Sequence, residues 1–179
     1  MNLRKFLVVG IFVLSLSVQA QEVKWYTFEE AIELNKKEPR KIMVDVYTDW
    51  CGWCKVMDRN TFSDSIVGGY LNLKYYPVKL NAEQKEDIVF RDITYKFIAQ
   101  GTRGYHELAA ALLNNQMGYP AIVFIDENIQ QKIQIIHVQK GYVQTGQFND
   151  IIRYIGGDHY KTMSWENWKT NQKSTFSAN

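Results

Sequence analysis

The sequence has few cysteines and prolines and no excess of charge of either sign. It contains two cysteines and three prolines among 179 residues, and 21 Lys and Arg residues face 19 Asp and Glu residues. There is no low-complexity tract or internal repeat, and hydrophobic residues make up 46% of the chain, which argues against a disordered protein. The balanced charge gives no basic surface for nucleic acid, so we expect no nucleic-acid partner.

The first twenty residues have the pattern of a signal peptide. Arg4 and Lys5 precede an apolar run over residues 6–18, and the run ends in Val18-Gln19-Ala20, a small-x-small cleavage pattern. The run is shorter than the roughly 20 residues that span a bilayer, although an uncleaved membrane anchor is the alternative interpretation. We therefore predict a signal peptide over residues 1–20, a domain over 21–157 and a C-terminal tail over 158–179.

The two cysteines, Cys51 and Cys54, are three residues apart. A bridge over so short a loop restrains the unfolded chain little, so the pair suits redox chemistry better than structural stabilisation. If a helix begins at Cys51, its free N–H groups stabilise a thiolate there, and Cys54 lies one turn later. We assign Cys51 as the nucleophile and Cys54 as the resolving thiol. Half of a zinc site is the competing interpretation, but only three scattered histidines remain as ligands, so we predict no metal.

The remaining pattern predicts an α/β domain with a mixed central sheet and helices on both faces. A strand–helix–strand unit and a later pair of adjacent strands indicate parallel and antiparallel pairing in one sheet. Pro77 favours an edge position or a bulge for its strand. Apolar spacing predicts that residues 83–117 are mostly helical. The other predicted helices cover 27–38, a segment beginning at the cysteines, 64–73 and 145–155, and the predicted strands cover 41–47, 74–80, 121–126 and 132–139.

The segment Lys41–Lys55, KIMVDVYTDWCGWCK, resembles the active-site segment of the thioredoxin family. The matching residues are a buried strand, an acid six residues before the first cysteine, and a W-C-G-x-C-K run. The resemblance extends over about residues 24–157 and implies a thioredoxin-like fold with a helical insertion before its cis-proline. It also implies thiol–disulfide oxidoreductase activity that needs no cofactor.

The resemblance assigns further site residues. It implies that Asp45 lies beneath the second cysteine and helps to move its proton, and that Lys79 pairs with Asp45. A carboxyl buried in an apolar strand has a raised pKa, which suits this role, whereas the alternative is an Asp on an exposed strand face. Tyr119-Pro120 resembles the family's cis-proline. The predicted substrate-contacting residues are Trp50, Gly52, Trp53, Tyr119 and Pro120.

The sequence also departs from the family pattern. Trp53 replaces the proline between the cysteines, so the redox direction does not follow from the resemblance alone. The 38 residues between Asn81 and Pro120 are about twice what thioredoxins need, and they precede the proline on the active-site side. This insertion either shapes substrate access or is a surface elaboration.

These observations predict an extracytoplasmic enzyme, periplasmic or secreted, that reduces disulfides in exported proteins. A reductase outside the cytosol needs electrons, so we also predict a membrane-bound thiol electron donor. A disulfide oxidant or isomerase is the alternative within this class, and Trp53 keeps it open. A non-catalytic binding module with an inert disulfide is the alternative from another class, and a peroxidase fits the C-x-x-C poorly.

Overall fold

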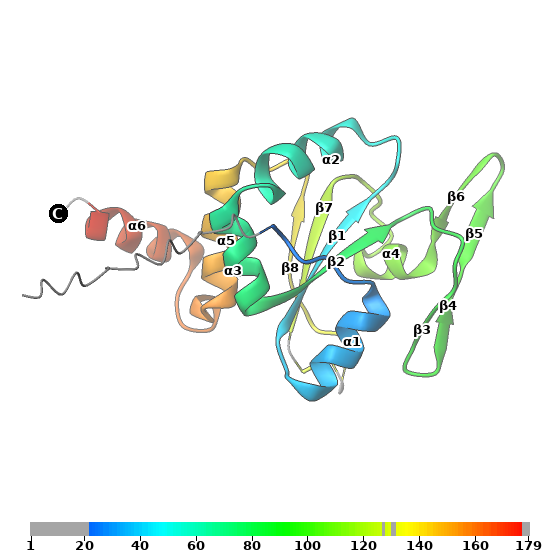
Figure 1. Cartoon of the computed structure of the whole chain (residues 1–179), viewed down its shortest axis with the longest axis horizontal. Coiled ribbons are helices and arrows are strands. Elements are labelled where there is room, and N and C mark those ends of the chain that lie inside the picture. Colours follow the sequence, from blue (N-terminus) through cyan, green and yellow to red (C-terminus); the bar gives the residue numbers. More distant parts are fainter. Residues whose placement is uncertain (1–21, 127, 130–131, 177–179) are drawn as a thin grey trace, which may run out of the picture.

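A four-stranded mixed sheet forms the centre of the computed structural model, which describes residues 22–126, 128–129 and 132–176 (Figure 1). The strand order is β2-β1-β7-β8, with β1 and β2 parallel and the other two pairs antiparallel. The strands are β1 (Lys41–Tyr47), β2 (Tyr75–Asn81), β7 (Ala121–Ile125) and β8 (Ile135–Lys140). The mixed sheet confirms the prediction, and the edge position of β2 accommodates Pro77.

Helices cover both faces of the sheet, as predicted. Because strand side chains alternate, Ile42 and Val44 lie on opposite faces from Met43 and Asp45. The first pair packs with α1 (Phe28–Lys37) and α4 (Glu107–Leu112). Met43 packs with the second group, which is α2 (Gly52–Met57), α3 (Ser65–Lys74) and α5 (Thr145–Gly156). Asp45 therefore lies on the face that α2 covers.

The segment before α1 sets where that helix begins. The Thr27 side chain accepts a hydrogen bond from the Glu30 N–H at 3.2 Å, and the Glu30 carboxylate accepts one from the Thr27 N–H at 2.8 Å. This reciprocal capping satisfies two backbone donors that would otherwise lack partners. The helix predicted over residues 27–38 is confirmed, and Thr27 is its N-cap.

The prediction of a mostly helical insertion over 83–117 is wrong. Two antiparallel hairpins precede the short helix α4, and they project from the sheet in Figure 1. The apolar residues of this segment are largely β-branched or aromatic, and short apolar runs do not distinguish helix from strand. Arg91, Asp92 and Gly101 adopt positive φ angles in the two hairpin turns. The strands are β3 (Ile88–Phe90), β4 (Ile93–Tyr95), β5 (Phe97–Gln100) and β6 (Arg103–His106).

The described part of the tail is helical and packs on α5. A 3₁₀ turn, η2 (His159–Lys161), leads into α6 (Trp165–Phe176). Trp168 is buried, and the Trp165 ring lies 5.3 Å from the Tyr154 ring. No helix in the described part of the chain is long and apolar enough to cross a membrane.

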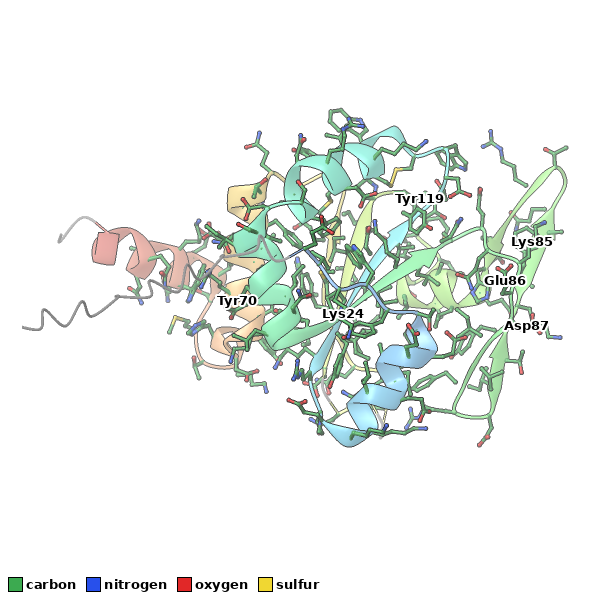
Figure 2. All side chains as sticks on the ribbon, viewed as in Figure 1. Lys24, Tyr70, Lys85, Glu86, Asp87 and Tyr119 are labelled. Carbon is green, nitrogen blue, oxygen red and sulfur yellow. A yellow bond between two sulfur atoms is a disulfide. The ribbon has the colours of Figure 1, made fainter. Side chains whose placement is uncertain are left out.

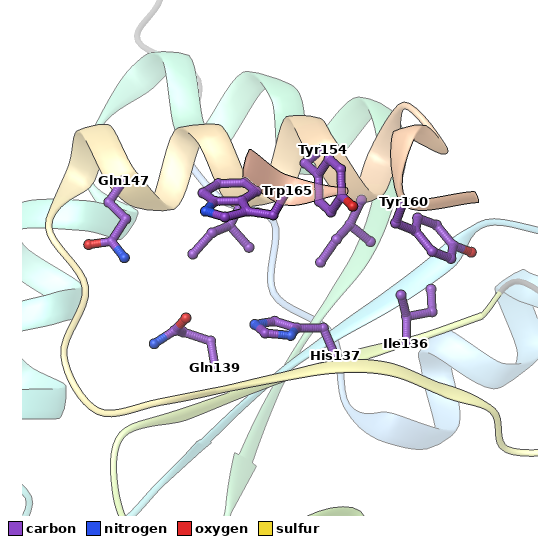
Figure 3. Close-up of a pocket in the computed structure, with 9 residues that line it drawn as sticks. Ile136, His137, Gln139, Gln147, Tyr154, Tyr160 and Trp165 are labelled. Atoms are coloured by element: carbon purple, nitrogen blue, oxygen red, sulfur yellow. The ribbon is translucent and has the colours of Figure 1, made fainter. Parts of the chain in front are cut away.

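A cavity of about 400 Å³ lies between α5, β8 and the tail (Figure 3). None of the predicted site residues lines it, so it belongs to a different part of the molecule from the cysteine pair. Its lining includes Ile136, His137, Gln139, Gln147, Tyr160 and Trp165.

Candidate active site

The cysteine pair lies where the loop after β1 enters α2. Cys51 is the N-cap residue of α2, and its sulfur accepts a hydrogen bond from the Cys54 N–H at 3.1 Å. The two sulfurs form a disulfide across one helical turn, with the Cα atoms 5.3 Å apart. Both cysteines are buried. The helix start that the sequence predicted at Cys51 is confirmed, and the pair has the geometry for reversible dithiol chemistry.

Two exposed tryptophans lie beside Cys51 in the sequence, one on each side. Trp50 is 62% exposed and Trp53 is 59% exposed, although both are large apolar side chains. The Trp50 ring lies 5.9 Å from the Tyr119 ring, and the Trp53 ring lies 5.3 Å from the Tyr142 ring. Exposed aromatic side chains of this kind are typical of a surface that contacts other proteins.

A shallow groove of about 350 Å³ lies beside three of these aromatic residues, Trp53, Tyr119 and Tyr142. Trp53, Tyr119, Pro120, Gly141 and Tyr142 line it. The Tyr119–Pro120 peptide bond is cis, as the resemblance implied, and Pro120 directly precedes β7. Tyr142, which is distant in sequence, was not predicted, and no local motif marks it.

Gly52 lies between the cysteines in open space. A Cβ atom added there would meet nothing within 4 Å, and the residue is exposed. Packing therefore does not require a glycine at this position, and a small residue leaves the surface beside Cys51 open to a partner.

Asp45 is the buried acid of the site. It is 1% exposed, and its Oδ2 accepts a hydrogen bond from Lys79 Nζ at 2.6 Å. Its other oxygen, Oδ1, is buried and has no hydrogen-bond partner among the described residues. The predicted Asp45–Lys79 pair is therefore present, and the alternative of an exposed aspartate is wrong. The free lone pairs of Oδ1 can accept a proton.

The electrostatics of this pair favour a carboxyl that titrates near neutral pH. Burial raises the pKa of Asp45 to about 6, and the Lys79 ammonium opposes this shift without cancelling it. Burial lowers the pKa of Lys79, but the carboxylates of Asp45 and Asp58 outweigh it and raise that pKa above its ordinary value. Lys79 therefore stays charged while Asp45 changes protonation.

A second carboxylate and three rings surround the Lys79 ammonium. Lys79 also donates a hydrogen bond to Asp58 Oδ1, at the start of the π-helical turn η1 (Asp58–Phe62). The rings of Trp25, Tyr47 and Phe62 lie 4.8, 5.1 and 5.3 Å from Nζ. Asp58 was not among the site residues predicted from the sequence. Its position four residues after Cys54 could have identified it, because residues four apart share a helix face.

The insertion lies beside Trp50, on the active-site side as predicted. Trp50 Nε1 donates a hydrogen bond to Glu83 Oε2 at 3.0 Å. A cavity of about 460 Å³ lies between Trp50 and the β5–β6 hairpin, and Lys85 and Phe97 also line it. The Lys85 ammonium lies 4.0 Å from the centre of the Phe97 ring. Figure 2 shows Lys85 on the segment that connects β2 to the hairpins.

The histidines are not gathered into a metal site. His106 is buried, caps α4 through its ring nitrogen and contacts the Glu86 carbonyl oxygen. His137 lines the cavity of Figure 3, and His159 contacts the Trp168 ring. Among the described residues, no group of three or more His, Cys, Asp or Glu side chains could hold a metal ion.

Residues 13–175 match the family Thioredox_DsbH, described as "Protein of unknown function, DUF255". The chain belongs to this family. The match covers most of the chain and includes the cysteine pair, Asp45, Lys79 and Pro120. The resemblance to thioredoxins that the active-site segment suggested is therefore confirmed at the level of the family.

Solved structures confirm the thioredoxin fold of this family member. A thioredoxin from Thermus thermophilus matches with a TM-score of 0.57 and 19% identity, over 75% of this chain and 87% of that one. A putative disulphide-isomerase from Bacteroides thetaiotaomicron matches with a TM-score of 0.55 and 20% identity, over 82% and 99%. A DsbH oxidoreductase matches with a TM-score of 0.53 and 16% identity, over 81% and 92%.

Curated relatives are longer proteins that match in part. Human spermatogenesis-associated protein 20 is 27% identical over 109 residues, which is 60% of this chain and 12% of that protein. The thiol:disulfide interchange protein DsbD of Pectobacterium atrosepticum is 44% identical over 36 residues, which is 20% of this chain and 6% of that protein. This chain thus spans a small fraction of the length of the curated relatives that it matches.

Proposed function

We propose that this protein is an extracytoplasmic thiol–disulfide oxidoreductase that reduces disulfides in exported proteins. The main observation in support is the Cys51–Cys54 pair at the start of α2, with Asp45 buried on the sheet face that α2 covers. A binding module with an inert disulfide would not need a buried acid there. The family match and the local similarity to DsbD support the same class of chemistry.

The proposed reaction is a two-electron exchange between dithiol and disulfide. The Cys51 thiolate attacks one sulfur of the substrate disulfide, forms a mixed disulfide and releases the other substrate sulfur as a thiolate. Cys54 then loses its proton to Asp45 and attacks the Cys51 sulfur. This step breaks the mixed disulfide, releases the second substrate thiolate and oxidises the pair to the Cys51–Cys54 disulfide.

Asp45 favours the reducing direction in this scheme. Cys54 lies in a buried site, where a thiolate is costly to form without a nearby proton acceptor. A carboxyl with a pKa of about 6 is ionised near pH 7, and Oδ1 has no competing hydrogen-bond partner among the described residues. Lys79 keeps this carboxylate charged by pairing with Oδ2.

The substrate chain is proposed to lie in the groove beside the cis-proline. Trp50, Trp53 and Tyr119 offer aromatic contacts, Gly52 leaves room beside the disulfide, and Pro120 lines the groove. The cavity between Trp50 and the β5–β6 hairpin extends this surface, so we propose that the insertion shapes substrate access.

The site of action and the electron supply complete the proposal. The signal-peptide pattern over residues 1–20 lies outside the described residues and supports export to the periplasm or the medium. Each catalytic cycle consumes two electrons, so a membrane-bound thiol donor must reduce the Cys51–Cys54 disulfide again. N-terminal sequencing of the exported protein tests the predicted start near Gln21.

The reduction potential of the pair tests the direction. Equilibration with graded thiol buffers is read by the fluorescence of Trp50 and Trp53, which flank the disulfide. A value near roughly −270 mV supports a reductase, and a value of roughly −120 to −180 mV supports an oxidant or isomerase instead. An inert disulfide would show no selective alkylation of Cys51 at low pH after reduction, which would support the binding module.

A further inference from the structure

Lys79 binds two carboxylates that differ in their access to solvent. The Asp45 side chain is 2% exposed and lies on the sheet face that α2 covers. The Asp58 side chain, in η1, is 43% exposed. Both carboxylates accept a hydrogen bond from the Lys79 ammonium, and the rings of Trp25, Tyr47 and Phe62 lie around that ammonium. Asp45 and the three rings also contact Nζ, so Lys79 keeps these contacts when Asp58 is replaced.

We propose that Asp58 is a positioning residue that shares the Lys79 ammonium with Asp45 and thereby sets how readily Asp45 takes the proton of Cys54. A single ammonium between two carboxylates neutralises neither of them fully. If Lys79 paired with Asp45 alone, the buried carboxylate would be stabilised as an anion and would be a weaker base. The inference rests on the proposed function, since it refines the step in which Cys54 is deprotonated.

The local backbone supports a specific role for Asp58. The α-helix that begins at Cys51 changes to a π-helical turn at Asp58, four residues after Cys54. Such turns are rare and occur often at functional sites. Here the turn contains both Asp58 and Phe62, so the same five residues supply a carboxylate and a ring to the surroundings of Lys79.

Few charged or titratable groups act on Asp45, so the effect of Asp58 is separable. In the described part of the chain they are Lys79 of β2, Asp58 of η1 and the phenol of Tyr47. The Cys54 thiol of α2 joins them when the disulfide is reduced. Removal of the Asp58 charge lowers the pKa of Asp45, because that negative charge opposes ionisation of the buried carboxyl.

The first test measures the resolving step directly. The reduced protein is mixed with 5,5′-dithiobis(2-nitrobenzoate), which releases one coloured thiolate when Cys51 attacks and a second when Cys54 resolves the mixed disulfide. The rate of the second release is followed from pH 4 to 9. This rate reports the coupled titration of Asp45 and Cys54.

We expect the low-pH limb of this profile to move to lower pH in Asp58→Asn, by less than about one pH unit, because the Asp58 charge is the weakest influence on Asp45 and is partly exposed to solvent. Asp58→Glu should restore the wild-type profile. Asp92→Asn, an exposed aspartate in the β3–β4 turn, is the matched control and should not move it. An unchanged or upward-moving limb in Asp58→Asn would overturn the inference.

A second measurement does not depend on activity. Carbon-13 NMR of the oxidised protein follows the titration of the Asp45 carboxyl, and Asp58→Asn should lower its midpoint while Asp92→Asn leaves it unchanged. If the wild type releases no second thiolate, the proposed function fails, and this titration still decides the role of Asp58. An Asp45 midpoint that is unaltered by Asp58→Asn refutes the inference even if the enzyme is active.

Discussion

The buried carboxyl of Asp45 should destabilise the oxidised protein at neutral pH, and Asp45→Asn should relieve this. Burial raises its pKa from 3.8 to about 6. At about 1.4 kcal/mol for each pKa unit, the ionised carboxyl lowers the free energy of unfolding by about 3 kcal/mol above pH 6. The substitution also removes one partner of Lys79, which keeps Asp58. We therefore expect a net gain of about 2 kcal/mol at pH 8.

The sign of the pH dependence follows from which state binds the proton more tightly. The folded protein holds the Asp45 proton more tightly than the unfolded chain, so wild-type stability falls as pH rises from about 4 to about 6. Below pH 4 the carboxyl is protonated in both states and this contribution vanishes. The difference between Asp45→Asn and wild type should thus grow by about 3 kcal/mol between pH 4 and pH 8.

Urea denaturation of the oxidised proteins at several pH values measures this difference. Asp92→Asn controls for loss of an exposed carboxylate and should track the wild type at every pH. A stability difference between Asp45→Asn and wild type that stays constant from pH 4 to 8 would show that Asp45 does not titrate as a buried acid. The assignment of Asp45 as the proton acceptor would then have to be withdrawn.

Three further predictions follow from the site and its surroundings. Cys54→Ser should accumulate mixed disulfides at Cys51 with substrate proteins, visible on non-reducing gels, whereas Cys51→Ser should form none, because only Cys51 is assigned the first attack. Gly104→Ala would place a Cβ 2.2 Å from the Phe97 ring and 2.5 Å from the Ile98 carbonyl oxygen, so the β5–β6 hairpin must shift. This substitution should raise KM several-fold for protein disulfides but not for a small-molecule disulfide. Trp168→Ala removes a buried ring from the contact of the tail with α5 and should lower the free energy of unfolding by about 3 kcal/mol in urea titrations, without changing the reduction potential.

The elements of the central sheet were predictable because their patterns are local. The apolar strand before Cys51, the cap at Thr27 and the turn at Tyr119-Pro120 each carry their signal within a few residues. The insertion was mispredicted because its local pattern does not distinguish a helix from a strand. Its short apolar runs fit both the helical period of 3.6 residues and the strand period of 2. In the structure, turns with positive φ angles at Arg91-Asp92 and Gly101 connect the strands of two hairpins.

The candidate site divides in the same way. The sequence identified the cysteine pair by its spacing and Asp45 as a charge that interrupts an apolar strand, whereas Lys79 came from the resemblance to thioredoxins. Only the tertiary structure revealed that Asp58 shares Lys79, that Trp25, Tyr47 and Phe62 enclose it, and that a hairpin from the insertion extends the surface beside Trp50. Spacing along the chain determines which chemistry is possible. The pKa of each charged group depends on burial and on neighbours that folding brings together from distant segments.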